Sequence, residues 1–152
     1  MDAVDKRVVA LLQGEFPVCE RPYGALAEKA GLSEEELWGR VEKLLLEGVI
    51  RRIGASMDSA GLGFSSTLAA VRVEPSRVEE AAEVIGGYEE VTHSYLRGDE
   101  YNIWFTVIAE SAERVGRIVG EIRERLGLEE ADVLNLPMKR MFKLDTRFDV
   151  QS

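Results

Sequence analysis

Several residue types are scarce in this chain of 152 residues, and each scarcity excludes a class of protein. The chain contains one cysteine, Cys19, so it can form no internal disulfide and no Cys-x-x-Cys metal site. No apolar run approaches the roughly 18 residues that are needed to cross a bilayer. The polar start Met1-Asp2 is not typical of a secretory signal. We therefore expect a cytoplasmic protein without a membrane span.

Positive charge is also scarce, since the formal net charge is −9. This balance disfavours nonspecific binding to nucleic acid, which depends on the neutralisation of phosphates by Lys and Arg. Two local groups of cations nevertheless stand out, and on an acidic protein they indicate a specific anionic ligand, with surface charge balance as the alternative. The two groups consist of Arg51, Arg52, Lys139, Arg140, Lys143 and Arg147.

Histidine is the rarest titratable type, and the single imidazole belongs to His93 in the segment 91–97. Alternate residues of a strand point to the same face, so a strand here places His93, Tyr95 and Arg97 on one side. An imidazole, a phenol and a guanidinium on one face are suited to a small-molecule site. The alternative for a lone strand histidine is a structural hydrogen bond.

The first third of the chain shows helical periodicity followed by a short β-prone run. Ser33 and Glu36 form a capping box at the start of one helix, and Gly31 is suited to end the helix before it. Helices joined by a tight turn, with a strand after them, are typical of a winged helix-turn-helix. The predicted elements of this domain, residues 1–55, are helices over 2–13, 26–30 and 34–47 and a strand over Val49–Ala55, and the segment that holds the second helix starts at Arg21-Pro22-Tyr23.

The remainder, after a Ser- and Gly-rich linker over 56–63, alternates between strand and helix patterns. The order β-α-β-β-α-β predicts a ferredoxin-like domain over 64–152, and thus an α+β fold for the whole chain. Ser111 and Gly127 are placed to begin and end the second helix. The predicted elements are strands over 67–74, 90–96, 101–109 and 131–136, helices over 76–85 and 111–126, and a tight hairpin turn at Gly98-Asp99.

A winged helix followed by such a domain resembles the Lrp/AsnC family of regulators over nearly the whole chain. The resemblance implies DNA binding by the first domain, and ligand binding and dimerisation by the second. The residues argue against the DNA part, because Glu34, Glu35 and Glu36 occupy the first turn of the recognition helix, where they would repel phosphates. The alternative for this Glu run is a capped helix stabilised by its dipole.

Three segments of the second domain resemble instead the siroheme decarboxylase subunits, an enzyme branch of the same fold. They are Thr92-His93-Ser94-Tyr95-Leu96-Arg97, Tyr101-Asn102-Ile103-Trp104-Phe105-Thr106 and the run Leu136–Lys143. Arg21-Pro22-Tyr23 and the Arg51–Ala55 run are similar to that branch as well. The first two segments form a fairly specific motif, because they place unlike polar residues at set spacings.

This second resemblance implies a carboxy-lyase that removes carbon dioxide from the C12 and C18 acetate side chains of siroheme. The product, 12,18-didecarboxysiroheme, serves alternative haem or haem d1 biosynthesis. No cofactor is implied, because the iron belongs to the substrate. The implied partner is a homologous second subunit in a heterodimer, with a homodimer as the alternative. A DNA-binding regulator, and a tetrapyrrole sensor or carrier without turnover, are the competing interpretations.

The expected roles follow from side-chain chemistry together with the resemblance. His93 or Tyr95 is the expected proton donor, since imidazole exchanges protons near neutral pH; His93 as an axial ligand of the substrate iron is the alternative. Trp104 is expected to form an apolar wall, with core packing as its alternative. The cations expected to bind substrate carboxylates are Arg97, Arg51, Arg52, Lys139, Arg140 and Lys143.

Overall fold

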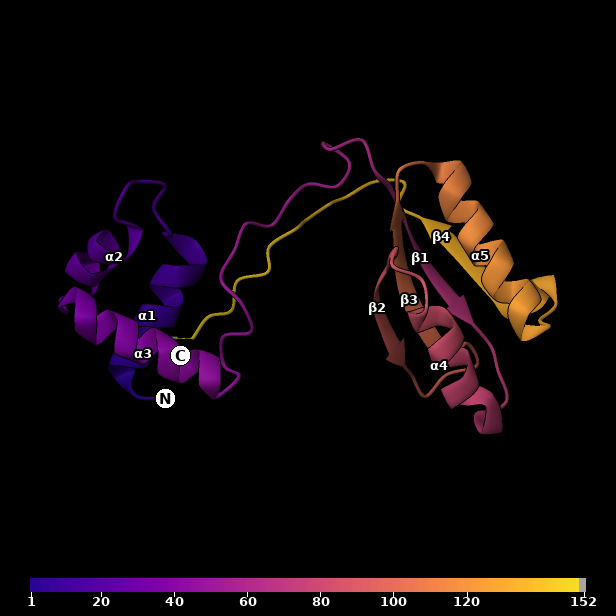
Figure 1. Ribbon diagram of the computed structural model, residues 1–152, viewed down its shortest axis with the longest axis horizontal. Coiled ribbons are helices and arrows are strands. Elements are labelled where there is room, and N and C mark those ends of the chain that lie inside the picture. The colour runs from indigo at the N-terminus through magenta and orange to yellow at the C-terminus, as the bar shows by residue number, and fades with distance from the viewer. Residues whose placement is uncertain (151–152) are drawn as a thin grey trace. The chain divides into compact units, whose positions relative to one another are not determined.

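The computed structural model describes residues 1–150, and the chain folds as two compact units (Figure 1). The first unit comprises Met1–Ala55 together with the C-terminal segment from Lys143, and the second comprises Ser56–Phe142. The C-terminal segment was expected in the second domain. The Gln13 side chain explains the difference, because its Oε1 accepts a hydrogen bond from the Phe148 N–H at 2.8 Å and its Nε2 donates to the Phe148 carbonyl at 3.3 Å.

The first unit is the predicted helix-turn-helix, with α1 (Ala3–Gly14), α2 (Pro22–Ala30) and α3 (Glu34–Leu46). The capping box of Ser33 and Glu36 is present at the start of α3, and Gly31 ends α2 in the left-handed conformation at φ 71°. The three helices enclose a small apolar core formed by Val8, Leu26, Ala27, Leu37 and Val41.

The strand expected over Val49–Ala55 is not formed, and no strand occurs among the described residues of the first unit. A β-prone segment becomes a strand only where a neighbouring strand pairs its backbone groups. This segment has no such neighbour among residues 1–150, although Ile53 packs against the helical core. The helix-turn-helix is therefore present without a β wing.

The second unit is the predicted βαββαβ arrangement. Its four strands are β1 (Ser65–Val71), β2 (Val91–Leu96), β3 (Ile103–Ala109) and β4 (Val133–Pro137), ordered β2-β3-β1-β4 with antiparallel neighbours. Its helices are α4 (Val78–Gly86), which follows the 3₁₀ turn η1 (Pro75–Arg77), and α5 (Ala112–Leu126), which precedes the turn η2 (Glu130–Asp132). The β2–β3 connection runs over 97–102 and is longer than the expected turn at Gly98-Asp99.

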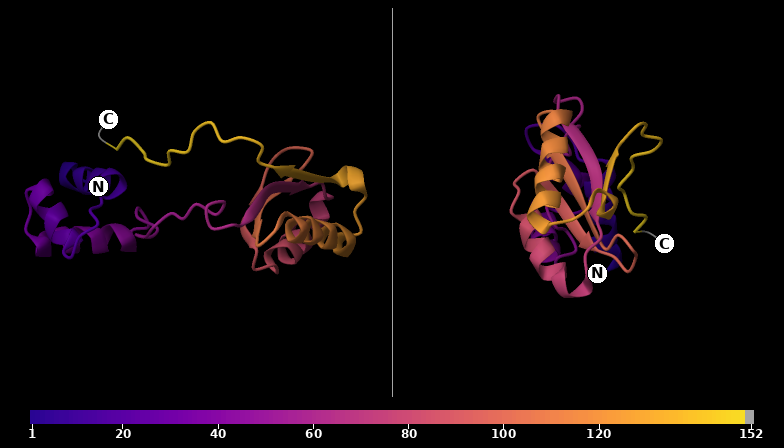
Figure 2. Two further views of the ribbon diagram at one scale, coloured as in Figure 1. Left: turned by 90° about the horizontal axis from the view of Figure 1, so that it is seen from above. Right: turned by 90° about the vertical axis from the view of Figure 1, so that its right-hand side faces the viewer.

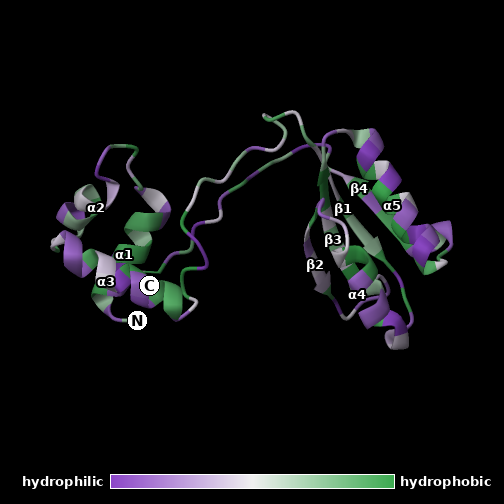
Figure 3. Ribbon diagram, viewed as in Figure 1, coloured by the Kyte–Doolittle hydropathy of each residue, from purple (hydrophilic) through white to green (hydrophobic). Residues whose placement is uncertain are grey.

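Both α4 and α5 lie over the same face of this sheet (Figure 2). The strict alternation of buried and half-buried residues along β3 shows that one face belongs to the core and the other does not. Phe105 is 1% exposed and is the largest fully buried side chain of that core. The hydropathy colouring agrees, with hydrophobic green prevailing along β1 and paler or purple shades along β2 (Figure 3). No helix of the second unit lies over the opposite face.

Within residues 1–150, no helix combines the length and the apolar composition that crossing a bilayer requires.

Candidate active site

The predicted imidazole–phenol pair lies on the helix-free face of the sheet, on the edge strand β2. His93 pairs with Thr106 of β3, and Tyr95 pairs with Trp104, in the antiparallel register. Paired residues of neighbouring strands point to the same face, so these four side chains share one side. A β-bulge between Val91 and His93 shifts the register there. It keeps His93 opposite a polar threonine instead of a core position.

His93 and Tyr95 lie close enough to act on one ligand. Their ring centroids are 6.3 Å apart with an interplanar angle of 19°, and the phenol-bearing Tyr95 is 55% exposed. The His93 Nδ1 is 2.9 Å from the Thr92 hydroxyl. This contact holds the ring through Nδ1 and leaves Nε2 as the nitrogen directed to other partners. The pair therefore offers one imidazole nitrogen and one phenol to a molecule bound on the sheet.

The centre of this face is apolar, although these residues were not predicted as part of a site. Leu68 of β1 pairs with Thr106 and with Leu136 of β4, so Leu68 and Leu136 share the face with His93. Both leucines are exposed. The sequence signal for this surface was the alternation along β1 and β4, which places Leu68 with Ala70, and Leu136 with Leu134, on one face. A flat apolar surface beside two polar rings is suited to a planar ligand.

Trp104 was expected as an apolar wall, and it is half-buried on this same face. Its indole Nε1 donates a hydrogen bond to the Tyr101 carbonyl at 2.8 Å. The indole is therefore held in a defined orientation opposite Tyr95. Phe105, its neighbour in the sequence, belongs to the core on the other face.

Arg97 follows the end of β2 and lines a shallow pocket of about 940 Å³ beside the start of α4. Three carboxylate residues, Glu79, Asp99 and Glu100, line the same pocket. Arg97 forms no ion pair with these carboxylates or with any other residue of 1–150. Arg97 therefore lies directly after β2, close to Tyr95 in the sequence.

Arg51 and Arg52 line a different cavity, which lies wholly within the first unit and has a volume of about 880 Å³. Its walls are mainly apolar and come from α1, from the loop after α1 and from the C-terminal segment. Neither arginine forms an ion pair with another described residue. The apolar residues that line it are Val9, Leu12, Phe16, Val18, Ile50, Ile53, Phe148 and Val150.

The predicted cation group over 139–147 is divided between the two units. Lys139 and Arg140 belong to the second unit and Lys143 to the first. The Arg140 guanidinium lies 4.7 Å from the ring centroid of Phe142, and Arg147 is paired with Asp145 at 2.9 Å. This ion pair, with its hydrogen bonds, lowers the pKa of Asp145 to about 2. Arg147 is therefore already bound, whereas Lys139 and Lys143 have no ion pair with residues 1–150.

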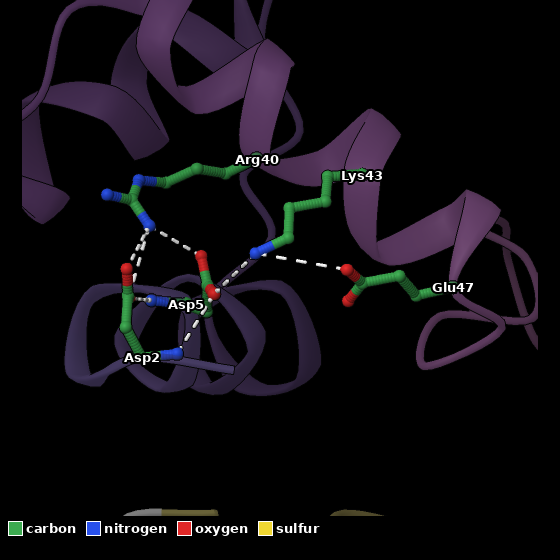
Figure 4. A network of polar contacts seen from close by, with 5 residues as sticks. All are labelled: Asp2, Asp5, Arg40, Lys43 and Glu47. Carbon is green, nitrogen blue, oxygen red and sulfur yellow. Dashed lines mark hydrogen bonds and ion pairs between the residues drawn. The ribbon is translucent and has the colours of Figure 1, made fainter.

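The cations of helix α3 form ion pairs with carboxylates of the first unit (Figure 4). The Arg40 guanidinium contacts Asp2 at 2.9 Å and Asp5 at 2.5 Å, and the Lys43 ammonium lies 3.6 Å from Asp5. Asp5 is fully buried and was not recognised in the sequence, although the Asp2-x-x-Asp5 spacing at a helix start is a capping-box signal.

These contacts keep both aspartates ionised. The backbone N–H of Asp5, followed by the guanidinium of Arg40, lowers the pKa of Asp2 to about 2. The backbone N–H of Asp2 and the Arg40 side chain also lower the pKa of Asp5. The two carboxylates in turn raise the pKa of Arg40. Because Arg40 is bound to two carboxylates, it is poorly suited to bind a phosphate group.

The fold and the matching family models define the class of this protein. Residues 61–143 match the model of the AsnC-like ligand binding domain, and residues 5–51 match the model of the siroheme decarboxylase NirDL-like HTH domain. The protein therefore joins a helix-turn-helix domain to an AsnC-like ligand-binding domain.

The particular family follows from two relatives. The chain is 43% identical to the alpha subunit of siroheme decarboxylase from Nitratidesulfovibrio vulgaris, over 97% of this chain and 82% of that protein. It is 35% identical to the siroheme decarboxylase NirD subunit of Pseudomonas aeruginosa, over 100% of this chain and 99% of that subunit. The chain belongs to the siroheme decarboxylase subunit family.

Solved structures agree with this placement. The crystal structure of the siroheme decarboxylase NirDL matches with a TM-score of 0.71 at 30% identity, over 91% of this chain and 45% of that one. The NirDL complex with an iron-uroporphyrin III analogue matches with a TM-score of 0.70 at 29% identity, over 95% and 47%. An AsnC family transcriptional regulator from Agrobacterium tumefaciens has a TM-score of 0.76 at 22% identity, over 97% and 96%, and it shows the fold alone.

Proposed function

We propose that this chain is a subunit of a siroheme decarboxylase, a carboxy-lyase that acts on the acetate side chains at C12 and C18 and yields 12,18-didecarboxysiroheme. The observation that carries the proposal is the His93–Tyr95 pair beside Trp104 on an otherwise apolar, helix-free sheet face. Family membership supports the same substrate, because one solved relative is a complex with an iron-uroporphyrin III analogue. The product would enter alternative haem or haem d1 biosynthesis.

The chemistry needs little from the protein beyond binding and one proton for each acetate. The bond between the methylene and the carboxylate carbon breaks, carbon dioxide leaves, and the electron pair stays on the methylene carbon. The macrocycle delocalises that pair, and a proton then converts the methylene into a methyl group. His93 or Tyr95 supplies this proton at the sheet surface. No cofactor is required, since the iron is part of the substrate.

His93 has a second possible role, as an axial ligand of the substrate iron. The contact of its Nδ1 with the Thr92 hydroxyl leaves Nε2 directed to a partner, which supports either assignment. In the ligand role, Tyr95 becomes the proton donor. A tetrapyrrole sensor or carrier that binds through His93 and performs no turnover is the alternative that this geometry also favours.

Substrate carboxylates require cations, and the structure offers several without an ion pair among the described residues. Arg51 and Arg52 in the first unit, and Arg97 at the end of β2, are three of them. Bidentate guanidinium–carboxylate contacts would define the orientation of the ring. The remaining proposed carboxylate ligands are Lys139, Arg140 and Lys143.

The proposed partner is a homologous subunit in a heterodimer, with a homodimer as the alternative. Two exposed edges, β2 and β4, leave backbone groups unpaired, and the apolar helix-free face is a further surface to cover. The subunit designations of the relatives support an assembly of more than one chain. The single cysteine supports a cytoplasmic location.

The competing DNA-binding regulator is supported by the helix-turn-helix and opposed by its charges. The first turn of α3 carries three glutamates, and its cations Arg40 and Lys43 contact Asp2 and Asp5. Phosphate contacts would have to break these ion pairs. The regulator is therefore the weaker candidate.

The test mixes the purified protein and a homologous partner subunit with siroheme under anaerobic conditions. Wild type should change the visible spectrum, release carbon dioxide and yield the doubly decarboxylated mass. His93→Ala and Tyr95→Phe should each lower turnover, by about 100-fold or more for the proton donor. Ser94→Ala, which pairs with the core residue Phe105 from the same strand, is the matched control and should retain activity.

The outcomes separate the candidates. Retained turnover in His93→Ala together with Tyr95→Phe would assign these rings a structural role and contradict the mechanism. A spectral change without carbon dioxide release would favour the sensor. An unchanged spectrum combined with tight binding to duplex oligonucleotides would favour the regulator.

A further inference from the structure

The Tyr101-Asn102 part of the motif makes contacts that differ from those of a ligand-binding group. The Asn102 Nδ2 donates a hydrogen bond to the Val73 carbonyl at 2.8 Å, and its Oδ1 accepts one from the Val73 N–H at 3.1 Å. One side-chain amide thus satisfies both backbone groups of a residue just beyond β1. In geometry this resembles one rung of a β ladder, continued by a side chain after the strands have separated.

Tyr101 extends the same junction in two directions. Its hydroxyl donates to the Ala131 carbonyl at 2.8 Å, just before β4, and its own carbonyl accepts the Trp104 indole N–H at 2.8 Å. Arg72 contacts Asp132 at 2.7 Å, contacts Glu100 in the β2–β3 loop, and lies 5.9 Å from the Tyr101 ring centroid. The start of β3 is therefore tied to the end of β1 and to the start of β4.

This junction matters for β2, because β2 is an edge strand and β3 is its one strand neighbour. The loop 97–102 is closed where the Arg97 N–H donates to the Asn102 carbonyl at 2.8 Å. The backbone of Asn102 thus begins the register that continues to Tyr95 opposite Trp104 and His93 opposite Thr106. A shift of one residue would turn these rings to the other face.

We propose that Asn102 is a positioning residue for the decarboxylation: its side-chain amide, bound to Val73, anchors the β2–β3 hairpin so that Tyr95 lies opposite Trp104 and His93 opposite Thr106. This role rests on the proposed function. Asn102 contributes no proton and no contact to the substrate. It acts through the His93 and Tyr95 rings. The position of these rings depends on the β2–β3 hairpin, in which β2 pairs with β3 alone.

The sheet contains a matched control, Asn135 of β4. Its side chain also bridges to β1, because its Oδ1 accepts a hydrogen bond from the Thr67 hydroxyl at 2.7 Å. Asn135 has no part in the β2–β3 register, since β4 pairs with β1 alone. Asn102→Ala removes two side-chain hydrogen bonds to the backbone of Val73, and Asn135→Ala removes one to the Thr67 side chain of the same unit, and only the first substitution touches the hairpin.

The single histidine of the chain supplies a readout that does not depend on activity. In Asn102→Ala the imidazole resonances of His93 should move, and nuclear Overhauser contacts between the His93 and Tyr95 rings should weaken. Asn135→Ala should leave both as in wild type, although it also removes a side-chain hydrogen bond from the sheet. Asn102→Asp, which keeps the acceptor for the Val73 N–H and loses the donor, should fall between wild type and Asn102→Ala.

With the assembled enzyme, Asn102→Ala should lower kcat for siroheme by on the order of 100-fold, the cost of misplacing reacting groups by about 1 Å. KM should change less than kcat, because Arg97 is the one proposed carboxylate ligand that lies on this hairpin. Equal kcat values and unchanged His93 resonances in the two alanine variants would overturn the proposal. A wild-type enzyme that does not decarboxylate siroheme overturns the proposed function instead, and the imidazole signals then still decide whether Asn102 positions His93.

Discussion

In the first unit, the cations Arg40 and Lys43 of α3 contact Asp2 and Asp5, whereas in the second unit His93 and Tyr95 stand exposed on an edge strand. The first arrangement stabilises the unit itself, because a buried carboxylate requires charged or hydrogen-bonding partners. The second leaves polar groups available to a ligand. Under the proposed function, the helix-turn-helix serves as a scaffold and the sheet carries the chemistry.

The largest expected effect tests whether the two units fold separately. Phe105→Ala removes the largest buried side chain of the second unit and should lower its free energy of unfolding by about 3–5 kcal/mol. Each unit contains one tryptophan, Trp38 in the first and Trp104 in the second. Urea unfolding followed by fluorescence in the Trp38→Phe and Trp104→Phe backgrounds therefore reports each unit by itself.

The Trp38 signal should keep its midpoint when Phe105 is replaced. As a control, Leu46→Ala at an exposed position should change stability by no more than about 0.5 kcal/mol. A shared midpoint for both tryptophans, lowered together by Phe105→Ala, would show that the units unfold as one and would break the comparison.

A smaller effect concerns the pH dependence of the first unit. Its contacts lower the folded pKa of Asp2 from the ordinary 3.8 of an aspartate to about 2, and they lower the pKa of Asp5 as well. A carboxyl whose folded pKa is depressed stabilises the fold above its unfolded pKa, and loses that contribution as the pH falls through the folded value. The stability of the first unit should therefore fall as the pH drops from about 4 towards 2.

Arg40→Gln tests the source of this pH dependence, since it removes one cause of the lowered pKa values of Asp2 and Asp5. The variant should be less stable than wild type at neutral pH, and the two proteins should converge at low pH. Trp38 fluorescence in the Trp104→Phe background measures both. Parallel pH profiles with a constant offset would mean that Arg40 contributes by packing instead of by charge.

The smallest effect is expected for DNA. Glu35→Lys reverses an exposed charge in the first turn of α3, and Arg40 and Lys43 keep their contacts with Asp2 and Asp5. Any binding of duplex oligonucleotides should stay weak, independent of sequence and steeply dependent on salt. Fluorescence anisotropy at low and high salt measures this. Tight, sequence-specific binding by wild type would contradict the scaffold role of the first unit.

Local chemistry made much of the fold predictable from the sequence. Ser33 and Ser111 cap their helices as expected, and Gly31 and Gly127 end helices in the left-handed conformation. The β-prone run before Ser111 forms β3 and contributes Phe105 to the core. These features depend on neighbours within one helical turn or on adjacent strand positions, so the sequence contains what decides them.

The misses share a different physical cause. The segment Val49–Ala55 has residues that favour a strand, but no strand of residues 1–150 pairs with it. Gln13 binds the backbone of Phe148, which lies far away in the sequence. Asn102 was grouped with the site by its motif, although its amide contacts Val73. Pairing partners of this kind depend on the folded path of the chain, which spacing alone does not contain.

The sequence by itself determined the charge balance, the helix ends, the βαββαβ order and the common face of His93 and Tyr95, because each follows from composition or from local periodicity. Tertiary structure alone decided which groups are already occupied. It bound Arg40 to Asp2 and Asp5, paired Arg147 with Asp145, and left His93 and Tyr95 exposed beside Leu68 and Trp104. The physical reason is that a charged side chain forms an ion pair only with groups within a few ångströms of it in space. Separation along the chain does not determine which groups those are.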